Sequence, residues 1–301
     1  MTTPADSRVD QTLARLLPPV ETWLDRFLPD LVTKGLVEFL VFGIKQAWAC
    51  LFGGLLLLGM IVTSVAYPVS APIARYDFLV LYAVAIQGLF LVTKLERPSE
   101  ALVILIFHVV GTVMEIFKTD AGSWMYPEDN LLRIGGVPLF SGFMYAAVGS
   151  YFARVARVFD FRWKHYPPLW LTLILALGIY VNFFSHHFVW DVRYVLFALT
   201  AVIFLRCQVY YRVWRWRHQM PLLLGFLLVS FFIWIAENIA TFTQIWLYPN
   251  QETGWHLVSL QKLGSWYLLM IVSWVLVTLV HRPQRVDQSY AGLCCGPHRW
   301  L

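Results

Sequence analysis

Two stretches of the chain repeat the residues that are best suited to chemistry. Each holds a glutamate, then a tryptophan and a tyrosine two residues apart, then a proline: Glu115, Trp124, Tyr126 and Pro127 in the first, and Glu237, Trp246, Tyr248 and Pro249 in the second. Matching positions are 122 residues apart. A positioned carboxylate can transfer protons, and an indole ring can stabilise a cation on an apolar substrate. The repetition predicts two related sites, with Glu115 and Glu237 as candidate catalytic groups.

A histidine extends the first site. His108 lies seven residues before Glu115, which is about two helical turns, so both side chains fall on one helix face. Because imidazole titrates near neutral pH, His108 and Glu115 could act as an acid and base pair. The alternative interpretation is a histidine that only bridges neighbouring helices.

A second polar group follows a later apolar segment and contains His186, His187 and Asp191. Nitrogen and carboxylate ligands of this kind bind zinc or non-haem iron. The spacing is unspecific, since neither His-x3-His nor His-Glu-x2-His occurs. A divalent metal is a cofactor that these residues could hold, but the sequence does not require it.

Charged groups at membrane depth need partners. Arg75 and Arg193 are the expected partners of the two glutamates, and Lys262 is expected to find a carboxylate such as Glu237 or Glu252. The alternative is that these are interfacial salt bridges with no role in binding. The candidate substrate-binding residues are Trp124, Tyr126, Trp246, Tyr248, Arg75, Arg193, Asn238 and Lys262.

Long apolar segments must position these residues. The chain of 301 residues is 59% hydrophobic and 14% charged, with a mean hydropathy of +0.62, which is far more apolar than a soluble protein. Because a membrane helix needs about 20 apolar residues, we expect an all-α, polytopic transmembrane bundle of about eight spans. The expected spans are roughly residues 46–66, 76–94, 99–117, 137–155, 168–184, 191–211, 219–241 and 256–280. Glycines between residues 120 and 138 predict a hairpin or cap over the bundle.

The basic residues predict the topology of these spans. Of the 23 lysines and arginines, 18 fall on the side of both termini and 5 on the other side. By the positive-inside rule both termini are cytoplasmic, and both glutamate motifs lie at the outer face. The basic residues adjoin the spans and no nucleic-acid-binding motif occurs, so the expected partners are membrane lipids and not nucleic acid. The oligomeric state is not determined.

Further pairs of residues suggest an internal duplication. They are Arg75-Tyr76 with Arg193-Tyr194, and Gly149-Ser150 with Gly264-Ser265. An even number of spans separates each pair, as in parallel repeats. The expected organisation is an amphipathic interfacial segment (1–45), two four-helix repeats (46–155 and 156–281) and a disordered tail (282–301). The alternative is convergence on residues that favour membrane interfaces.

Four runs of sequence closely resemble a known family: Phe42–Gly54, His108–Pro127, Gly135–Ser150 and Glu237–Trp255. The family is a group of bacterial integral-membrane proteins defined as domain of unknown function 817, and the resemblance covers roughly residues 35 to 283. It implies a bacterial inner-membrane protein and assigns no functional residues. A glutamate followed by an aromatic-Tyr loop and Gly-Val-Pro is also similar to membrane carotenoid hydratases and cyclases, which suggests an isoprenoid substrate.

The leading functional hypothesis is an outward-facing cavity between two four-helix repeats that binds or modifies a lipid or isoprenoid. One alternative is a proton-coupled carrier of small molecules in which the repeats rock against each other. Another is a membrane scaffold without turnover. The residues do not decide whether the protein is an enzyme.

Overall fold

The computed structural model of the chain describes residues 8–68 and 70–286, which are mostly helical. The helices are α1 (Arg8–Leu24), α2 (Asp30–Ala49), α3 (Leu51–Ala66), α4 (Arg75–Val92), α5 (Pro98–Asp120), α6 (Phe140–Val158), α7 (Leu169–Ser185), α8 (Arg193–Phe204), α9 (Leu222–Phe242) and α10 (Leu260–Val280). Pro98 opens α5, and Pro168 and Pro221 precede α7 and α9, because proline is preorganised for a helix start. Each expected span contains the larger part of one helix from α3 to α10.

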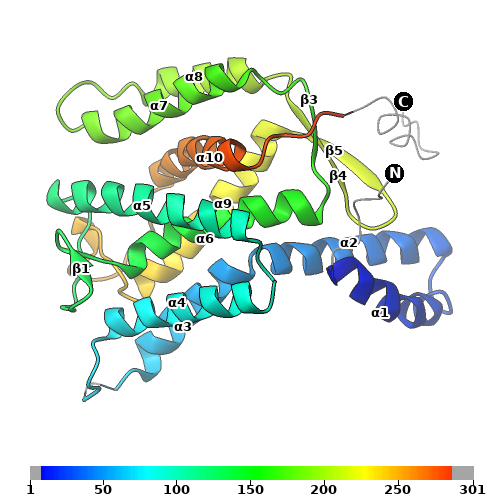
Figure 1. Cartoon of the computed structure of the whole chain (residues 1–301), viewed down its shortest axis with the longest axis horizontal. Coiled ribbons are helices and arrows are strands. Elements are labelled where there is room, and N and C mark those ends of the chain that lie inside the picture. The colour runs from blue at the N-terminus through cyan, green and yellow to red at the C-terminus, as the bar shows by residue number, and fades with distance from the viewer. Residues whose placement is uncertain (1–7, 69, 287–301) are drawn as a thin grey trace.

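The helices place both glutamate motifs at one end of the molecule. The connections from α3 to α4, from α5 to α6 and from α7 to α8 lie together at the left in Figure 1. Helix α1 and the hairpin of β4 (Gln208–Arg212) and β5 (Arg217–Pro221) lie at the opposite end. The α5–α6 connection includes the predicted hairpin, formed by β1 (Arg133–Ile134) and β2 (Val137–Pro138). Gly135 and Gly136 make its turn, with φ of +58° and +79°, which non-glycine residues rarely adopt.

Four helices of the described part are long and apolar enough to cross a membrane: α4, α5, α9 and α10. Helices α2 and α3 meet the same requirement only as a pair, which is bent by 70° and would give a fifth span. Helices α7 and α8 are apolar but shorter. The helices therefore suggest a membrane protein, and the expected number of eight spans is not confirmed.

Helix α6 explains part of this difference. It packs against α2, α3, α4, α5 and α10, so it lies among other helices. A membrane helix in that position does not need apolar side chains on every face, because little of it contacts lipid. Its sequence accordingly includes glycine, serine and tyrosine among its apolar residues. Its small residues Gly142, Ala146, Gly149 and Ala153 follow the interface pattern typical of closely packed membrane helices.

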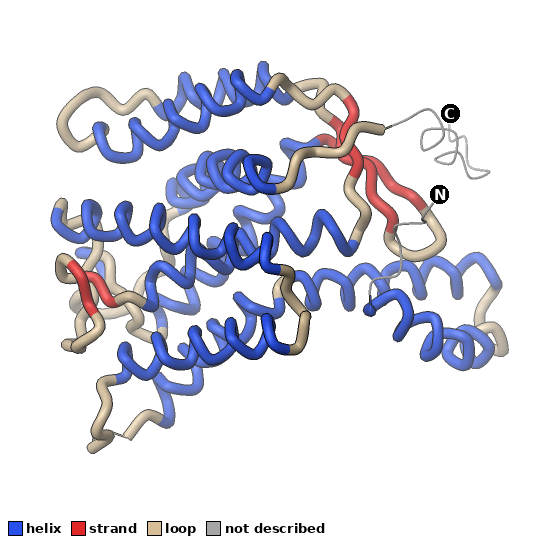
Figure 2. The backbone as a smooth tube through the Cα atoms, in the orientation of Figure 1, coloured by secondary structure: helices blue, strands red, loops and turns tan. Residues whose placement is uncertain are grey.

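A three-stranded antiparallel sheet interrupts the second half of the chain, as Figure 2 shows in red. It consists of β3 (Arg162–Lys164), β4 (Gln208–Arg212) and β5 (Arg217–Pro221). The expected span 191–211 is therefore wrong at its end, because α8 stops at Phe204 and β4 follows. The polar residues Arg206 and Gln208 beside Val209, Tyr210 and Tyr211 favour a strand over a helix in lipid.

The expected interfacial segment forms two helices, α1 and α2. Pro18 and Pro19 lie inside α1. Lys45 of α2 is fully buried and forms a 2.8 Å ion pair with Asp10 of α1, which fixes the two helices to each other. The expected disordered tail is wrong in its first residues, since Trp163 exchanges backbone hydrogen bonds with Gln284 and Val286. Residues 287–301 lie outside the described part of the chain.

Gly111→Ala is expected to destabilise the protein by about 1–3 kcal/mol, the usual cost of overpacking. A Cβ at Gly111 of α5 would lie 2.6 Å from the Cβ of Tyr145 in α6, and an atom so close to the backbone cannot move away alone. Gly88→Ala is the matched control, because Gly88 on α4 has no atom within 4 Å of the added Cβ. Detergent-solubilised variants should differ in thermal unfolding, and equal melting temperatures would contradict close α5–α6 packing.

Candidate functional site

Glu115 of α5 is buried within a set of aromatic hydrogen-bond donors. Its Oε2 accepts hydrogen bonds from Trp124 Nε1 at 2.8 Å and from Tyr126 Oη at 2.6 Å. Its Oε1 accepts one from Tyr145 Oη of α6 at 2.6 Å. Burial, followed by the nearby Glu115 charge, raises the pKa of Tyr126 well above its usual value, so this phenol stays protonated and donates. Both residues of the predicted Trp-x-Tyr pair thus bind the predicted glutamate.

Glu237 of α9 has a similar but smaller set of donors. Tyr248 Oη donates to its Oε1 at 2.5 Å, and Trp266 Nε1 of α10 donates to its Oε2 at 2.9 Å. Tyr248 follows Glu237 by 11 residues, the same distance that separates Tyr126 from Glu115. Burial and the Glu237 charge raise the pKa of Tyr248 well above its usual value. Each glutamate therefore binds the tyrosine of its own motif and one aromatic donor from the next helix.

The two motifs also contact each other directly. Met125 and Leu247, the central residues of the two Trp-x-Tyr pairs, exchange backbone hydrogen bonds of 2.9 Å in both directions. The Trp124 ring lies edge-on to the Tyr248 ring, with centroids 6.2 Å apart. Sequence analysis predicted that both motifs share one end of the molecule, but it did not predict this antiparallel bridge.

A large cavity lies beside both glutamates, with a volume of about 1030 Å³. Glu115, Trp124, Trp246, Tyr248 and Glu237 line it at the end that holds the motifs. Phe42, Phe159, Phe161 and Tyr211 line it near the sheet. Most of the remaining lining is apolar or aromatic, and it comes from both halves of the chain. The cavity is large even for a ligand site, since such pockets usually measure about 300–1,000 Å³.

Cationic and imidazole side chains surround the cavity near the motifs. Lys118 Nζ lies 2.8 Å from His187 Nε2 and 3.4 Å from His186 Nε2. Because an ammonium group only donates, both imidazoles must accept, and both are neutral. Burial and the Lys118 charge lower the pKa of His186 and of His187, which agrees with that assignment. Lys262 Nζ lies 4.3 Å from the Tyr248 ring centroid and 5.4 Å from that of Trp124.

The expected partners of the two arginines are wrong, whereas Lys262 keeps an electrostatic interaction with Glu237, its expected partner, without a contact. Arg75 pairs with Glu128 at 2.6 Å and donates to the Gln244 carbonyl, and Arg193 pairs with Asp191. Among the described residues, no carboxylate lies within 4.0 Å of Lys262. The contacts to the glutamate oxygens come from Trp and Tyr donors and not from these arginines.

His108 and Asn238 are among the predicted site residues that do not line the cavity. The His108 ring packs 4.5 Å from the Phe143 ring and beside Gly142, and in the described structure its Nδ1 has no hydrogen-bond partner. Asn238 accepts from the Val258 amide and donates to the Trp234 carbonyl, so it ties a loop to α9. These contacts favour a structural role for both side chains, and the geometry does not pair His108 with Glu115.

The described residues contain no group of three His, Cys, Asp or Glu side chains that could hold a metal ion. His186 and His187 face Lys118, whereas the Asp191 carboxylate accepts hydrogen bonds from Asn182 and Arg193. Burial raises the pKa of Asp191, but these hydrogen bonds outweigh it and the net shift is downward. The predicted metal ligands therefore serve separate contacts.

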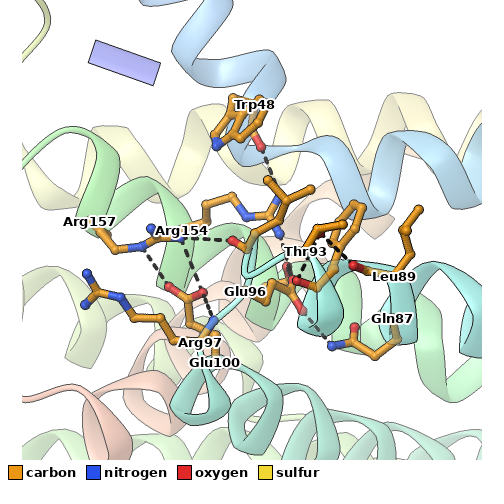
Figure 3. Close-up of polar contacts among 12 residues, drawn as sticks. Trp48, Gln87, Leu89, Thr93, Glu96, Arg97, Glu100, Arg154 and Arg157 are labelled. Atoms are coloured by element: carbon orange, nitrogen blue, oxygen red, sulfur yellow. Dashed lines mark hydrogen bonds and ion pairs between the residues drawn. The ribbon is translucent and has the colours of Figure 1, made fainter. Parts of the chain in front are cut away.

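Sequence analysis missed a buried ion-pair cluster at the α4–α5 connection, which Figure 3 shows. Arg154 Nη2 lies 2.8 Å from Glu96 Oε1, and each side chain is 1% exposed. Ser150 and Gln87 also donate to the Glu96 carboxylate, at 2.7 and 2.6 Å. Arg154 Nη1 donates to the Trp48 carbonyl, next to the α2–α3 bend. The signal available in the sequence was a single arginine inside an otherwise uncharged stretch of α6.

A family comparison covers the elements that build this site. Residues 38–274 match the model of a protein family described as "Protein of unknown function (DUF817)". The chain belongs to the DUF817 family. This confirms the resemblance found in the sequence, and the match includes both glutamates, both Trp-x-Tyr pairs and Lys262.

A relative from Bacillus subtilis (strain 168), the "Uncharacterized protein YoaT", is 42% identical over 244 residues. The alignment covers 81% of this chain and 92% of that protein. No solved structure matches the chain.

Proposed function

We propose that this DUF817 protein binds a lipid or isoprenoid in the cavity between its two halves. The observation that supports the proposal is the cavity itself, about 1030 Å³ in volume and lined mainly by apolar and aromatic side chains. An apolar cavity with a few polar groups at one end suits a ligand with a long hydrocarbon part. In this proposal the protein crosses the bacterial inner membrane, with both termini in the cytoplasm and the motifs at the outer face.

The two halves of the cavity are proposed to be parallel repeats, α3–α6 and α7–α10. Three observations support this arrangement: the 11-residue spacing from each glutamate to its tyrosine, the donors from α6 and α10, and the Met125–Leu247 bridge. A reciprocal antiparallel bridge is the contact that a twofold axis generates between equivalent residues. The ligand would lie close to this axis, with one glutamate on either side.

The proposed role of the glutamates is to organise the polar end of the cavity. Each carboxylate fixes a tyrosine and a second aromatic ring. Of these rings, Trp124, Tyr145, Tyr248 and Trp266 form part of the wall that a ligand would meet. Proton transfer on a bound isoprenoid remains a further hypothesis of the same site. It requires that Glu115 or Glu237 exchange a proton, whereas binding does not.

Gly54→Phe is expected to remove at least nine-tenths of the lipid or isoprenoid that co-purifies specifically with the protein. Gly54 of α3 lines the cavity and has no atom within 4 Å of an added Cβ, so a large ring there would occupy ligand space without a clash at its base. Gly88→Phe is the matched control, since Gly88 on α4 is equally uncrowded but outside the set of residues that line the cavity.

The measurement is mass spectrometry of organic extracts from both variants and the wild type after exhaustive detergent exchange. A hydrophobic molecule held by the wild type and Gly88→Phe but lost from Gly54→Phe supports the proposal. Identical extracts from all three proteins would contradict it.

A further inference from the structure

Lys118 is a buried charged residue of the site that forms no ion pair with either glutamate. Its side chain lies in α5 just before the α5–α6 connection, and the residue is 3% exposed. Its nitrogen contacts two neutral imidazoles and lies 4.2 Å from the Phe183 ring centroid. Among the described residues, no carboxylate lies within 4.0 Å of it. A buried cation whose direct contacts are neutral is costly, and Asp191 attracts Lys118 only from beyond 4.0 Å, which points to an anion that completes the site.

Two more cations line the same end of the cavity. Lys262 reaches it from α10, over the Tyr248 and Trp124 rings, and Arg193 reaches it from the first residue of α8. Lys118, Lys262 and Arg193 thus come from three helices and border one space. Arg193 keeps Asp191 as a partner, whereas in the described structure Lys118 and Lys262 have carboxylates near them but none within 4.0 Å.

The two glutamates do not neutralise these lysines by contact. Tyrosine and tryptophan donors occupy both oxygens of Glu115 and both oxygens of Glu237. The lysine nitrogens therefore keep their donor capacity for a ligand. Ser123, Ser259 and Gln261 line the cavity at the same end and can add neutral hydrogen bonds.

We propose that Lys118 and Lys262, with Arg193 beside them, bind an anionic phosphate or carboxylate group at the motif end of the cavity. This inference rests on the proposed function, because the apolar remainder of the cavity would hold the hydrocarbon part of the same ligand. The site is then selective for amphipathic molecules with an acidic headgroup. Neutral lipids with the same chains would bind more weakly, since they leave both ammonium groups without an anion.

The test compares three probes on the purified full-length protein in uncharged detergent. They are phosphatidic acid, diacylglycerol with the same acyl chains, and inorganic phosphate. Phosphatidic acid is expected to bind at least about tenfold more tightly than diacylglycerol, as one charge-assisted contact contributes about 1.5–3 kcal/mol. Lys262→Met and Lys118→Met should each remove most of that preference, whereas Lys262→Arg should keep it.

Lys34→Met is the control for nonspecific charge, because the Lys34 side chain is 40% exposed and, in the part of the chain that the structure describes, its ion pair is with Asp30 of the same helix. If Lys118→Met fails to fold, Lys262→Met still tests the proposal. The described Lys262 nitrogen contacts two aromatic rings and forms no ion pair, so its removal is expected to disturb the fold less. If inorganic phosphate binds with the same lysine dependence while phosphatidic acid shows no advantage, the anion site stands and its ligand is a free anion.

Equal binding of phosphatidic acid and diacylglycerol, unaffected by either lysine variant, would overturn the anion site. The proposed function would survive that result if Gly54→Phe still abolished binding of both lipids. Failure of the anion site and failure of the lipid cavity are thus separate outcomes.

Discussion

Arg154→Met is expected to reduce the free energy of unfolding by about 3–5 kcal/mol, the usual cost of removing one partner of a buried ion pair. Glu96 is only 3% exposed, and the variant would leave its carboxylate without the guanidinium partner. It would also remove the donor to the Trp48 carbonyl beside the 70° bend between α2 and α3. Unfolding of the detergent-solubilised protein by a denaturing detergent or by heat measures the loss.

Lys34→Met supplies the matched comparison, because it also removes a cation from an ion pair but at an exposed i,i+4 position. Its expected cost is about 0.5 kcal/mol or less. Arg154→Met combined with Glu96→Met should recover part of the lost stability, since the buried charge is then gone as well. If Arg154→Met and Lys34→Met unfold at the same temperature, the buried ion-pair cluster does not stabilise the fold.

The long apolar segments predicted the positions of the helices better than the number of membrane spans. The apolar segments that form α3 to α10 were each predicted as a helix. The prediction succeeded because a long apolar run, in some cases with a proline before it, has few alternatives to a helix. The number of spans was not settled in the same way. Helix α6 is enclosed by other helices, so its sequence carries packing residues and lacks the signal of contact with lipid.

The sheet was missed for a related reason. Val209, Tyr210 and Tyr211 are apolar or aromatic and were counted as the end of a span despite Gln208, because a hydropathy average does not distinguish a strand from a helix over so few residues. What selects the strand is its pairing with β3 and β5. Glu38 of α2 closes the β4–β5 connection by accepting hydrogen bonds from the Trp214, Arg215 and Trp216 amides. Contacts across 176 residues of chain leave no local signal.

In the candidate site, too, local sequence predicted some features, while contacts between distant segments determined the others. Repetition of Glu, Trp, Tyr and Pro predicted which residues gather, because the repeated spacing of 11 residues keeps each tyrosine within reach of its own glutamate. Partner choice was not predictable, as Tyr145 and Trp266 lie 30 and 29 residues beyond their glutamates on separate helices. Lys118 was counted only as a topology marker, and its burial beside two histidines comes from the tertiary structure.

Glu115→Leu is expected to destabilise the protein by about 3 kcal/mol or more. Leucine removes the acceptor of three aromatic donors, and each buried donor left unsatisfied costs about 1–3 kcal/mol. The free energy of unfolding of Glu115→Gln should stay within about 1 kcal/mol of the wild type, because glutamine can still form a hydrogen bond with each of the three side chains. The amide oxygen can accept from Trp124 and Tyr126, while the amide nitrogen donates to the Tyr145 hydroxyl, which can reverse its own hydrogen bond.

Thermal unfolding of the two variants in the same detergent decides between two explanations of the Glu115 pocket. A stable Glu115→Gln beside an unstable Glu115→Leu shows that donor satisfaction holds the pocket together. If glutamine is as damaging as leucine, the negative charge is itself required. In the first case Glu115→Gln becomes the variant with which to test proton transfer, because it removes a titratable group and leaves the wall of the cavity in place. Glu237→Gln follows the same logic, since Trp266 needs an acceptor and the Tyr248 hydroxyl can reverse.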